Sequence, residues 1–374
     1  MMSWTAQRLR ELLDGECAHM CAHMGCDMHV HSSYSSDVPD VLSQRPLNRL
    51  LSALERGMYY FVLTDHDTMA GYVQLMDELS MMGEVGKLAA ERVISGVELS
   101  CRCPEVGIVH TNVFGLDERQ FAHIDRLRDA GGFVRLERLM PYLDAEGLVC
   151  SLNHPLWQPP DGNITFSKVV RGVLTTLLNR RLHNGEAISQ KIVESLYSPE
   201  GQRRMEEVYR GTLDIAGQFS LIEVNGSRVA LMNDIAEHIA SEVGVPTCGG
   251  SDDHYGEVLG LCYTIADGKD KWEFLERVEK GMGQVMRRDA DFATSCMRFI
   301  NFIRLVAESE EPDEVVVSLF NSQIGRLPLL IAPRFIRLMY RLLNRRNKRA
   351  QRAVEIMATS YLKAQDLRGG RGTS

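Results

Sequence analysis

Six histidines of this 374-residue chain stand within or directly after short apolar runs, where the strands of a parallel sheet would end. His29 and His31 are two residues apart, so in a strand both imidazoles point to the same face. Imidazole is a ligand of zinc, manganese and iron, and the two rings can therefore share one ion. A hydrogen-bonded or surface histidine would explain any single position better than all of them together. The other four are His66, His110, His154 and His254.

Carboxylates accompany these histidines, which extends the pattern from one ion to several. Asp37 follows His31 by six residues, and Glu98 ends an apolar run. A set of six imidazoles with two to four carboxylates exceeds what one tetrahedral ion needs, and it suits two or three ions. Glu98 is the natural carboxylate to bridge two of them. Further acids stand beside two of the histidines, at Asp65, Asp67, Asp252 and Asp253.

Closely spaced divalent ions predict hydrolysis. One ion lowers the pKa of a bound water, so that hydroxide can attack a phosphoryl or acyl centre, while another stabilises charge on the oxygens. The simpler alternative for part of the pattern is structural, since Asp67 or Thr68 could cap the helix that follows. Capping would account for Asp67 but not for His66.

Seven apolar runs must position these side chains. They alternate with helical patterns over roughly 47–55, 69–88, 118–144 and 233–242, which predicts parallel pairing in an α/β layered fold or barrel. Periodicity does not separate an open sheet from a barrel. The predicted strands are Gly25–His31, Tyr59–Thr64, Arg92–Glu98, Val106–Phe114, Leu148–Asn153, Phe219–Asn225 and Val245–Gly249.

The motifs in this order resemble the PHP (polymerase and histidinol phosphatase) superfamily of metal-dependent phosphoesterases. The resemblance covers about residues 25–285, and the stretch Leu63–Gly71 is similar to small phosphoesterases that act on nucleotide bisphosphates and short oligonucleotides. It implies an α/β fold, a distorted (β/α)7 barrel with a trinuclear site at its strand ends. The matching motifs are His29-Met-His31, Asp37, Thr64-Asp-His-Asp67, Glu98, His110, Asn153-His-Pro155 and Ser251-Asp-Asp-His254.

The resemblance also implies the ligands of each ion. His29, His31, Glu98 and Asp252 would hold the first; Glu98, His110 and His154 the second; Asp37, His66 and His254 the third. Some relatives have a histidine where Asp37 stands, which puts the third ion in doubt. Asp65, Glu98 and His254 are the expected catalytic residues, and Asp65, Asp67 and Asp253 are expected to orient imidazoles without binding an ion. The expected cofactors are two to three divalent ions of zinc, manganese or iron.

Two segments have no counterpart in this resemblance. A helical insert over about 166–215 offers Lys168, Arg171, Arg180 and Arg181 to substrate phosphate, although these can equally form a solvated helix face. The organisation is therefore an N-terminal helix (1–24), a PHP-like domain (25–285) and a helical, basic extension (286–374) with a disordered end. The expected substrate is a nucleotide or other small phosphorylated compound. The alternatives are an exonuclease on short oligonucleotides and a non-catalytic scaffold whose basic tail binds partners.

Charge and composition set the remaining expectations. Residues 301–374 hold 13 Lys/Arg and seven Asp/Glu, whereas the whole chain has a net charge of −8, so the body is acidic and unsuited to coating nucleic acid. Residues 334–352 carry eight basic residues and no acid on an amphipathic pattern. That helix either docks on the acidic body or binds an anionic membrane or acidic partner. Nine cysteines without scaffold spacing, and no apolar run of about 18 residues, favour a cytoplasmic protein with reduced thiols.

Overall fold

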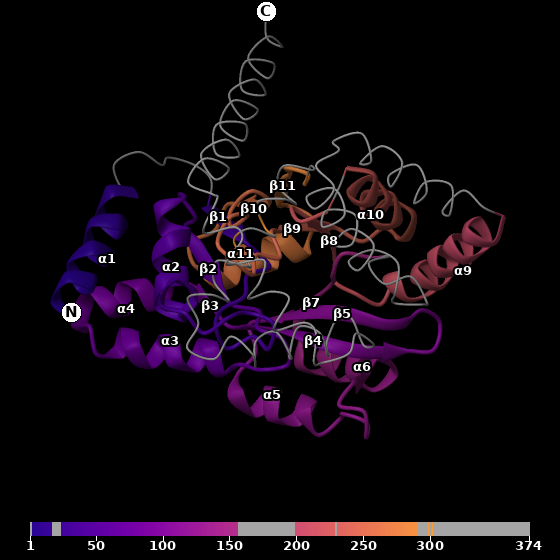
Figure 1. Ribbon diagram of the computed structural model, residues 1–374, viewed down its shortest axis with the longest axis horizontal. Helices are drawn as coiled ribbons and strands as arrows, with labels where there is room; N and C mark the ends of the chain where they lie inside the picture. Colours follow the sequence, from indigo (N-terminus) through magenta and orange to yellow (C-terminus); the bar gives the residue numbers. More distant parts are fainter. Residues whose placement is uncertain are drawn as a thin grey trace, which may run out of the picture.

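The computed structural model describes residues 2–16, 24–155, 199–228, 230–290, 298 and 301. Within them the fold is mixed α/β, with two sheets and surrounding helices (Figure 1). None of the described helices is long and apolar enough to span a bilayer. The helices are α1 (Met2–Glu16), the 3₁₀ turn η1 (Leu42–Gln44), α2 (Pro46–Glu55), α3 (Ala70–Ser80), α4 (Gly83–Glu91), α5 (Glu118–Asp125), α6 (Leu136–Glu146), α9 (Pro199–Ala216), α10 (Ala230–Val243) and α11 (Lys271–Glu279).

The strands form a five-stranded sheet, ordered β11-β10-β1-β2-β3, and a six-stranded sheet, ordered β6-β4-β5-β7-β8-β9. All seven predicted apolar runs contain strand structure, and β6, β10 and β11 add to them. The strands are β1 (Met24–Asp27), β2 (Tyr60–Val62), β3 (Val93–Ile94), β4 (Gly96–Cys103), β5 (Gly107–Phe114), β6 (Val134–Arg135), β7 (Val149–Leu152), β8 (Leu221–Asn225), β9 (Thr247–Gly250), β10 (Tyr263–Ala266) and β11 (Gln284–Met286).

The prediction of parallel pairing throughout is wrong for β5, which runs antiparallel to both β4 and β7. The register pairs Cys103 with Gly107, so only three residues connect β4 to β5. A connection this short makes a hairpin, because parallel neighbours need a crossover of a dozen or more residues. Strands β10 and β11 also pair antiparallel, with β1 and with each other.

Two of the expected helices are interrupted. Residues 69–88 form α3 and α4 with a break at Met81 and Met82, after which Gly83 has a φ of +62°. Residues 118–144 are divided by a turn at Gly131 and Gly132, whose lack of a side chain favours non-helical backbone. Of the helical insert, α9 is described and is helical; the residues before it lie outside the described part, as do most of those after 290.

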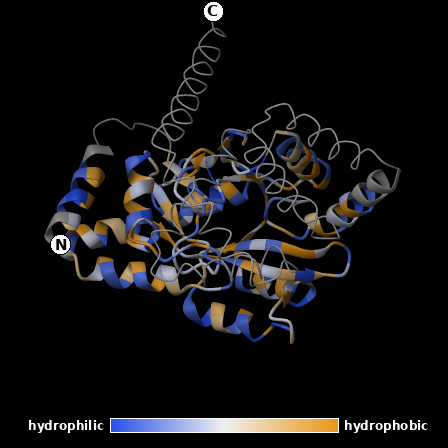
Figure 2. Cartoon of the chain, in the orientation of Figure 1, coloured by the Kyte–Doolittle hydropathy of each residue, from blue (hydrophilic) through white to orange (hydrophobic). Residues whose placement is uncertain are grey.

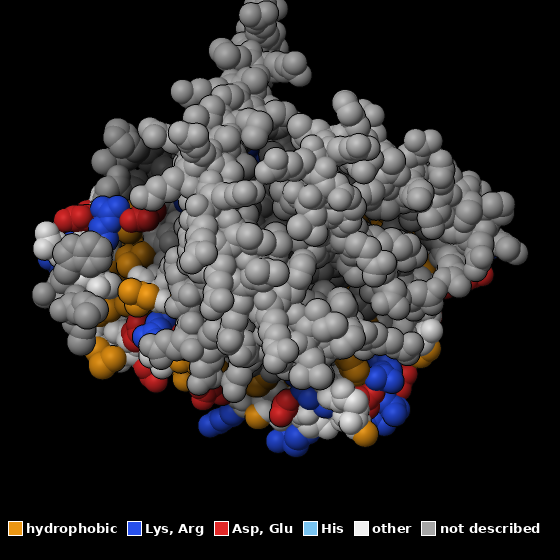
Figure 3. Space-filling view, in the orientation of Figure 1, with side chains coloured by type: hydrophobic (Ala, Val, Ile, Leu, Met, Phe, Trp, Pro, Cys, Tyr) orange, Lys and Arg blue, Asp and Glu red, His pale blue; other side chains and the backbone are white. Residues whose placement is uncertain are grey.

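The helices cover the sheets at different ends of the molecule (Figure 1). Helix α1 packs on α2 and α4, and its Leu9 and Leu13 are buried with Leu50 of α2 and Leu79 of α3. Helix α10 packs on β8 and α9, and α6 packs on β4. Hydrophilic and hydrophobic residues mix along α1, α3 and α5, as expected of helices with one buried face (Figure 2). Lys and Arg side chains lie among Asp and Glu along the described lower edge in Figure 3.

Backbone hydrogen bonds join the two sheets just beyond β1, β2 and β9. His29 O accepts from Asp252 N at 2.8 Å, and His31 N donates to Asp253 O at 3.1 Å. On the other side, Glu98 N donates to Asp65 O at 3.2 Å. The segments that carry the chemistry-bearing motifs are therefore held side by side by main-chain contacts, and their side chains are directed into a common space.

Candidate metal centre

Glu98 of β4 lies at the centre of the histidine cluster, with no exposed surface. Its two carboxylate oxygens face different sets of imidazoles. Such a division is what a carboxylate needs to bridge two cations, which the sequence predicted. The ring nitrogens at Oε2 are His29 Nε2 (3.1 Å), His31 Nε2 (3.3 Å) and His66 Nδ1 (3.1 Å), and those at Oε1 are His110 Nδ1 (3.1 Å) and His154 Nε2 (3.4 Å).

The polar atoms around Glu98 fit a cation better than they fit one another. Among the described residues, Glu98 Oε2 accepts no hydrogen bond although three ring nitrogens surround it, and His110 Nδ1 has no hydrogen-bond partner either. The Nε2 atoms of His29 and His31 point at each other across 3.0 Å. Buried polar atoms that converge without hydrogen bonding are rare in folded proteins. A divalent cation among them would satisfy these atoms together.

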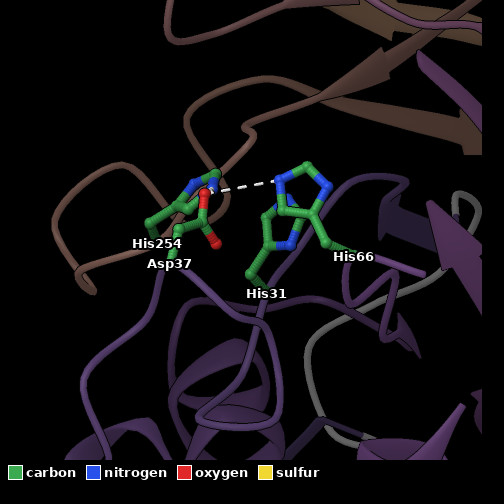
Figure 4. A group of neighbouring side chains, drawn as sticks. All are labelled: His31, Asp37, His66 and His254. Carbon is green, nitrogen blue, oxygen red and sulfur yellow. Dashed lines mark hydrogen bonds and ion pairs between the residues drawn. The ribbon is translucent and has the colours of Figure 1, made fainter. Parts of the chain in front are cut away.

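A second group of candidate ligands surrounds Asp37 (Figure 4). Asp37 Oδ2 lies 2.9 Å from His254 Nε2 and 3.4 Å from His66 Nε2. The His31 ring lies between them, with its centroid 4.0 Å from that of His254. These four side chains come from loops after β1, β2 and β9. Three of them, Asp37, His66 and His254, are the residues expected at the third ion, and His31 joins them.

Asp252 connects the two groups. Its Oδ1 lies 3.6 Å from His29 Nε2, 3.4 Å from His31 Nε2 and 3.4 Å from His254 Nδ1. Its other oxygen, Oδ2, accepts a hydrogen bond from Arg228 Nη2 at 3.0 Å. Asp252 therefore lies beside His29 and His31, the imidazoles expected at the first ion, and one of its oxygens faces them.

The imidazoles are held in place through the ring nitrogens that do not face the centre. His29 Nδ1 lies 2.7 Å from Glu223 Oε1, His31 Nδ1 lies 3.2 Å from Ser35 Oγ, and His254 Nδ1 lies 3.0 Å from the carbonyl oxygen of Asp252. Metal-binding histidines commonly have such a partner, because it fixes the tautomer and the ring orientation. In all three residues it leaves Nε2 directed into the cluster.

Glu223 of β8 is the acidic residue that the sequence reasoning missed. It is 1% exposed, and its Oε2 accepts from the main-chain N–H of His154 at 2.7 Å. It also lies close enough to His29 and His154 to form a candidate ligand group with them. The signal was present in the sequence, because a charged residue in the middle of the apolar run FSLIEVN is buried and needs a partner.

The three acids expected to orient imidazoles form no hydrogen bond to an imidazole of the described residues. Asp65 accepts from Ser32 N at 2.6 Å and Ser32 Oγ at 2.7 Å, which fixes the residue after His31. Asp67 accepts from Ser100 N and Oγ, and it pairs with Arg128 at 2.8 Å. Asp67 therefore braces the turn before α3 and does not cap that helix. The capping alternative is also wrong for Thr68, because the N-cap residue of α3 is Met69 and no side chain caps it, although Thr68 Oγ1 accepts from Ala70 N.

Asp253 pairs with a fully buried arginine, Arg49 of α2. Arg49 Nε also donates to the carbonyl oxygen of His31 at 2.9 Å, and Arg49 Nη2 donates to that of Asp253 at 3.1 Å. Asp253 accepts further bonds from the main-chain N–H groups of Gly256 and Val258. The Arg49–Asp253 pair thus fixes the two loops that carry His31 and His254.

Among the described residues, three other than glycine have a positive φ, and all three stand in the motifs that carry the candidate ligands. Asp67, His154 and Asp252 have φ angles of 56°, 28° and 54°. This conformation costs of the order of 1–3 kcal/mol outside glycine and collects at functional sites. At Asp252 and His154 it accompanies side chains that face Glu98 or its imidazoles.

The electrostatics are those of a site that exchanges protons for cations. Burial disfavours charge on Glu98 and Asp252, but the facing imidazoles, His29 foremost, outweigh it and hold the pKa of each carboxyl well below its usual range. Burial also opposes charge on His66, yet Glu98 and Asp37 raise the pKa of His66 to about 10. Protons on imidazoles therefore balance the carboxylates, and bound cations would displace them. For His154, burial lowers the pKa to about 4, which leaves a neutral ligand.

The structure thus brings together all nine expected metal ligands. The four residues expected to bind substrate, Lys168, Arg171, Arg180 and Arg181, lie outside the described residues. The ligands come from the ends of β1, β2, β7 and β9, from within β4 and β5, and from the loop that holds Asp37.

Residues 231–282 match the family described as PHP-associated. The matched segment includes Ser251-Asp-Asp-His254, the last of the predicted motifs. This match agrees with the resemblance to the PHP superfamily that the motifs indicate. No curated protein matches the chain by sequence.

Several solved structures resemble most of the chain, and three of them follow. PsfC from Pseudomonas syringae is 18% identical over 76% of this chain and 100% of that one, with a TM-score of 0.46. A two-domain Bacteroides vulgatus protein containing a predicted PHP-like metal-dependent phosphoesterase is 16% identical over 75% and 70%, with a TM-score of 0.43. An amidohydrolase from Chromobacterium violaceum is 15% identical over 70% and 98%, with a TM-score of 0.36. All three TM-scores are below 0.5, so these likenesses are distant.

Proposed function

We propose that this chain is a metal-dependent hydrolase of phosphate esters whose catalytic centre is built around Glu98. The observation that carries the proposal is the division of five imidazoles between the two oxygens of this buried carboxylate. The match to the PHP-associated family adds independent support. A non-catalytic scaffold would not need nine converging ligand side chains, because burying so many ionisable groups costs stability.

We also propose that the strands form a distorted (β/α)7 barrel. Hydrogen bonds beyond the strand ends link β9 to β1 and the segment after β2 to β4, which would close a ring of β1, β2, β4, β5, β7, β8 and β9. A shared apolar core supports this ring. Six of those strands each contribute a residue to it: Cys26, Tyr60, Phe114, Val149, Leu221 and Cys248. The candidate ligands then lie at one mouth of the barrel.

We propose that three ions are bound by the ligand sets that the PHP resemblance implies, and the distances are compatible with these sets. Glu98 Oε2 with His29, His31 and Asp252 would hold one ion, and Glu98 Oε1 with His110 and His154 a second. Asp37, His66 and His254 would hold the third. Bound ions would supply Lewis-acid activation of water and neutralise charge on phosphate oxygens. Zinc, manganese and iron all suit this mixture of nitrogen and oxygen donors.

The protein's own residues fix the geometry of this reaction. Glu223 orients His29, and the pair of Arg49 and Asp253 fixes the loop of His254. Asp65 acts through Ser32, and we propose that it keeps the loop from His31 to Asp37 in place. A small phosphorylated compound is the proposed substrate, and a short oligonucleotide is the alternative that a substrate panel would separate from it.

The test replaces Glu98 with glutamine, which keeps the shape but removes the charge between the cations. The full-length chain, expressed with added metal and purified without chelator, is assayed on phosphate monoesters, diesters and short oligonucleotides. We expect two to three ions per chain in the unmodified protein, and a fall in kcat/KM by orders of magnitude in Glu98→Gln. Glu84→Gln is the matched control, because Glu84 lies on the surface of α4 with its side chain 78% exposed.

Either of two results would contradict the proposal. Elemental analysis could find less than one ion per chain after metal-supplemented expression. Alternatively, Glu98→Gln could turn over as fast as Glu84→Gln, which would remove Glu98 from the reaction.

A further inference from the structure

Arg298 lies beyond the last strand and reaches back to the metal centre. Its Nη2 donates to the main-chain carbonyl oxygen of Asp252 at 3.4 Å. The same carbonyl oxygen lies 3.0 Å from His254 Nδ1 and 3.4 Å from Ser227 Oγ. The left-handed backbone of Asp252, with its φ of 54°, accompanies this arrangement. The Arg298 guanidinium thus contacts the main chain of Asp252, which is a candidate metal ligand.

A second arginine lies on the same side of Asp252. Arg228 is 7% exposed, and its Nη2 bonds to Asp252 Oδ2 at 3.0 Å. Burial and then the charge of Arg298 lower the pKa of Arg228, against the opposing effect of Asp252. Both arginines thus contact Asp252, Arg228 through the side chain of Asp252 and Arg298 through its main-chain carbonyl oxygen. Positive charges held together beside a metal site are stabilised by an anion that contacts both of them.

The carboxylate nearest to Arg298 is a weak counter-ion for it. Glu257 Oε1 is 3.9 Å from Arg298 Nε and, within the part of the chain that the structure describes, has no hydrogen bond. Burial and the charge of Asp253 raise the pKa of Glu257. Its Oε2 accepts from Asn301 Nδ2 at 3.2 Å. Glu257 thus contacts both Arg298 and Asn301, and it neutralises Arg298 only in part.

The Arg298 side chain is partly exposed and makes few contacts with the described residues. Its side chain is 20% exposed, and its described contacts are one long hydrogen bond and one distant ion pair. A guanidinium offers five N–H donors in a planar fork, which suits the oxygens of a phosphate group. Most of these donors are not used by the described residues around it.

We propose that Arg298 binds the phosphate oxygens of the substrate beside the metal centre, assisted by the charge of Arg228. The inference rests on the proposed phosphoesterase function and narrows its substrate class. Two guanidinium charges next to divalent cations favour a dianion over a monoanion, so phosphate monoesters are the preferred substrates over diesters. Arg298, which follows β11 in the chain, would then be a residue of the active site.

The experiment compares full-length, metal-loaded Arg298→Ala and Arg298→Lys with the unmodified chain. Arg288→Ala is the matched control, because Arg288 is an exposed arginine ten residues earlier. The measurements are kcat and KM on p-nitrophenyl phosphate and on bis(p-nitrophenyl) phosphate, the Kd of inorganic phosphate by calorimetry, the metal content and Tm. For Arg298→Ala we expect KM on the monoester and the phosphate Kd to rise about 10- to 100-fold, as losing a charge-assisted hydrogen bond implies.

The metal content and kcat of Arg298→Ala should change little, and its KM should rise less on the diester than on the monoester. The KM and phosphate Kd of Arg298→Lys should fall between those of Arg298→Ala and the unmodified chain. The inference is overturned if the phosphate Kd of Arg298→Ala equals that of Arg288→Ala, whatever happens to Tm, because Arg298 would then only attach its segment to the body. If the unmodified chain hydrolyses none of the esters, the phosphoesterase proposal fails separately. The phosphate Kd still decides whether Arg298 binds the anion.

Discussion

Replacing Glu223 with glutamine tests whether the centre depends on a residue outside the predicted ligand set. The carboxylate is 1% exposed and makes two short contacts, each 2.7 Å long, to His29 Nδ1 and to the main-chain N–H of His154. A third bond, from Asn225 Nδ2, measures 3.0 Å. Glutamine has one acceptor oxygen in place of two, so either His29 or His154 would face an amide N–H group. It also loses the charge that makes the His29 imidazole a stronger donor to a cation.

The expected size of the effect follows from these contacts. Removing a hydrogen-bond partner of a metal-binding imidazole typically costs 10- to 100-fold in metal affinity. That is about 1.4–2.7 kcal/mol, since each factor of ten is worth about 1.4 kcal/mol. We therefore expect Glu223→Gln to bind zinc roughly 10- to 100-fold more weakly than the unmodified chain. Catalysis should fall at limiting metal and recover in part when metal is added in excess.

The assay equilibrates metal-free protein against solutions of buffered free zinc and measures bound zinc by elemental analysis. Glu84→Gln serves as the control for a lost surface carboxylate. If Glu223→Gln and Glu84→Gln bind zinc with affinities within a factor of about two, well below the expected loss, the contacts of Glu223 do not orient a ligand and the reasoning is refuted.

Two further predictions concern the buried ion pair of Arg49 and Asp253 and the buried cysteines. Arg49→Met leaves Asp253 as an unpaired buried charge, so the free energy of unfolding in urea should fall by about 3–5 kcal/mol; a loss no larger than that of the exposed Arg10→Met would contradict this role. Burial raises the pKa of Cys101 to about 12 and that of Cys150 to about 11, so both thiols stay protonated at pH 8. A thiol reagent should leave the six buried cysteines of the described residues unmodified in the native chain and react with all nine after denaturation; mass spectrometry that found native Cys101 or Cys150 labelled would count against it.

The sequence predicted the candidate ligands more fully than it predicted how the strands pair. Most of the candidate ligands are polar residues within or next to an apolar run, and that contrast is visible locally, as at His154 after Leu148–Asn153. The direction of β5 was not visible in the local sequence, because strand and helix periodicity do not encode which neighbour a strand pairs with. The predicted strands ended at Glu98 and began again at Val106, whereas β4 continues to Cys103 and leaves only three residues before β5.

Residues that act through long-range contacts were the least predictable. Arg49 lies in the middle of α2, where an arginine is usually a surface residue, and its partner Asp253 is more than 200 residues away. Glu223 was readable as a buried charge, but nothing near it in the chain indicated that His29 is its partner. The strand prediction for residues 25–31 was wrong beyond Asp27, since Asp27 Oδ1 accepts from His29 N and Ser251 N and the regular pairing ends there. The two imidazoles of His29 and His31 still meet, as the spacing predicted.

The contacts of His29 and His31 with residues 252–254 also bear on how the chain is synthesised. At roughly 5–20 residues per second, the roughly 220 residues that separate His31 from His254 take on the order of 10–40 s to be translated. Until then, β1 lacks its antiparallel neighbour β10, and the segment after β1 lacks the partners at 249–253. A nascent chain therefore carries an unpaired strand edge, which is prone to mispairing, for most of its synthesis. The nine candidate ligands can all come together only after the segment with Asp252 and His254 has left the ribosome.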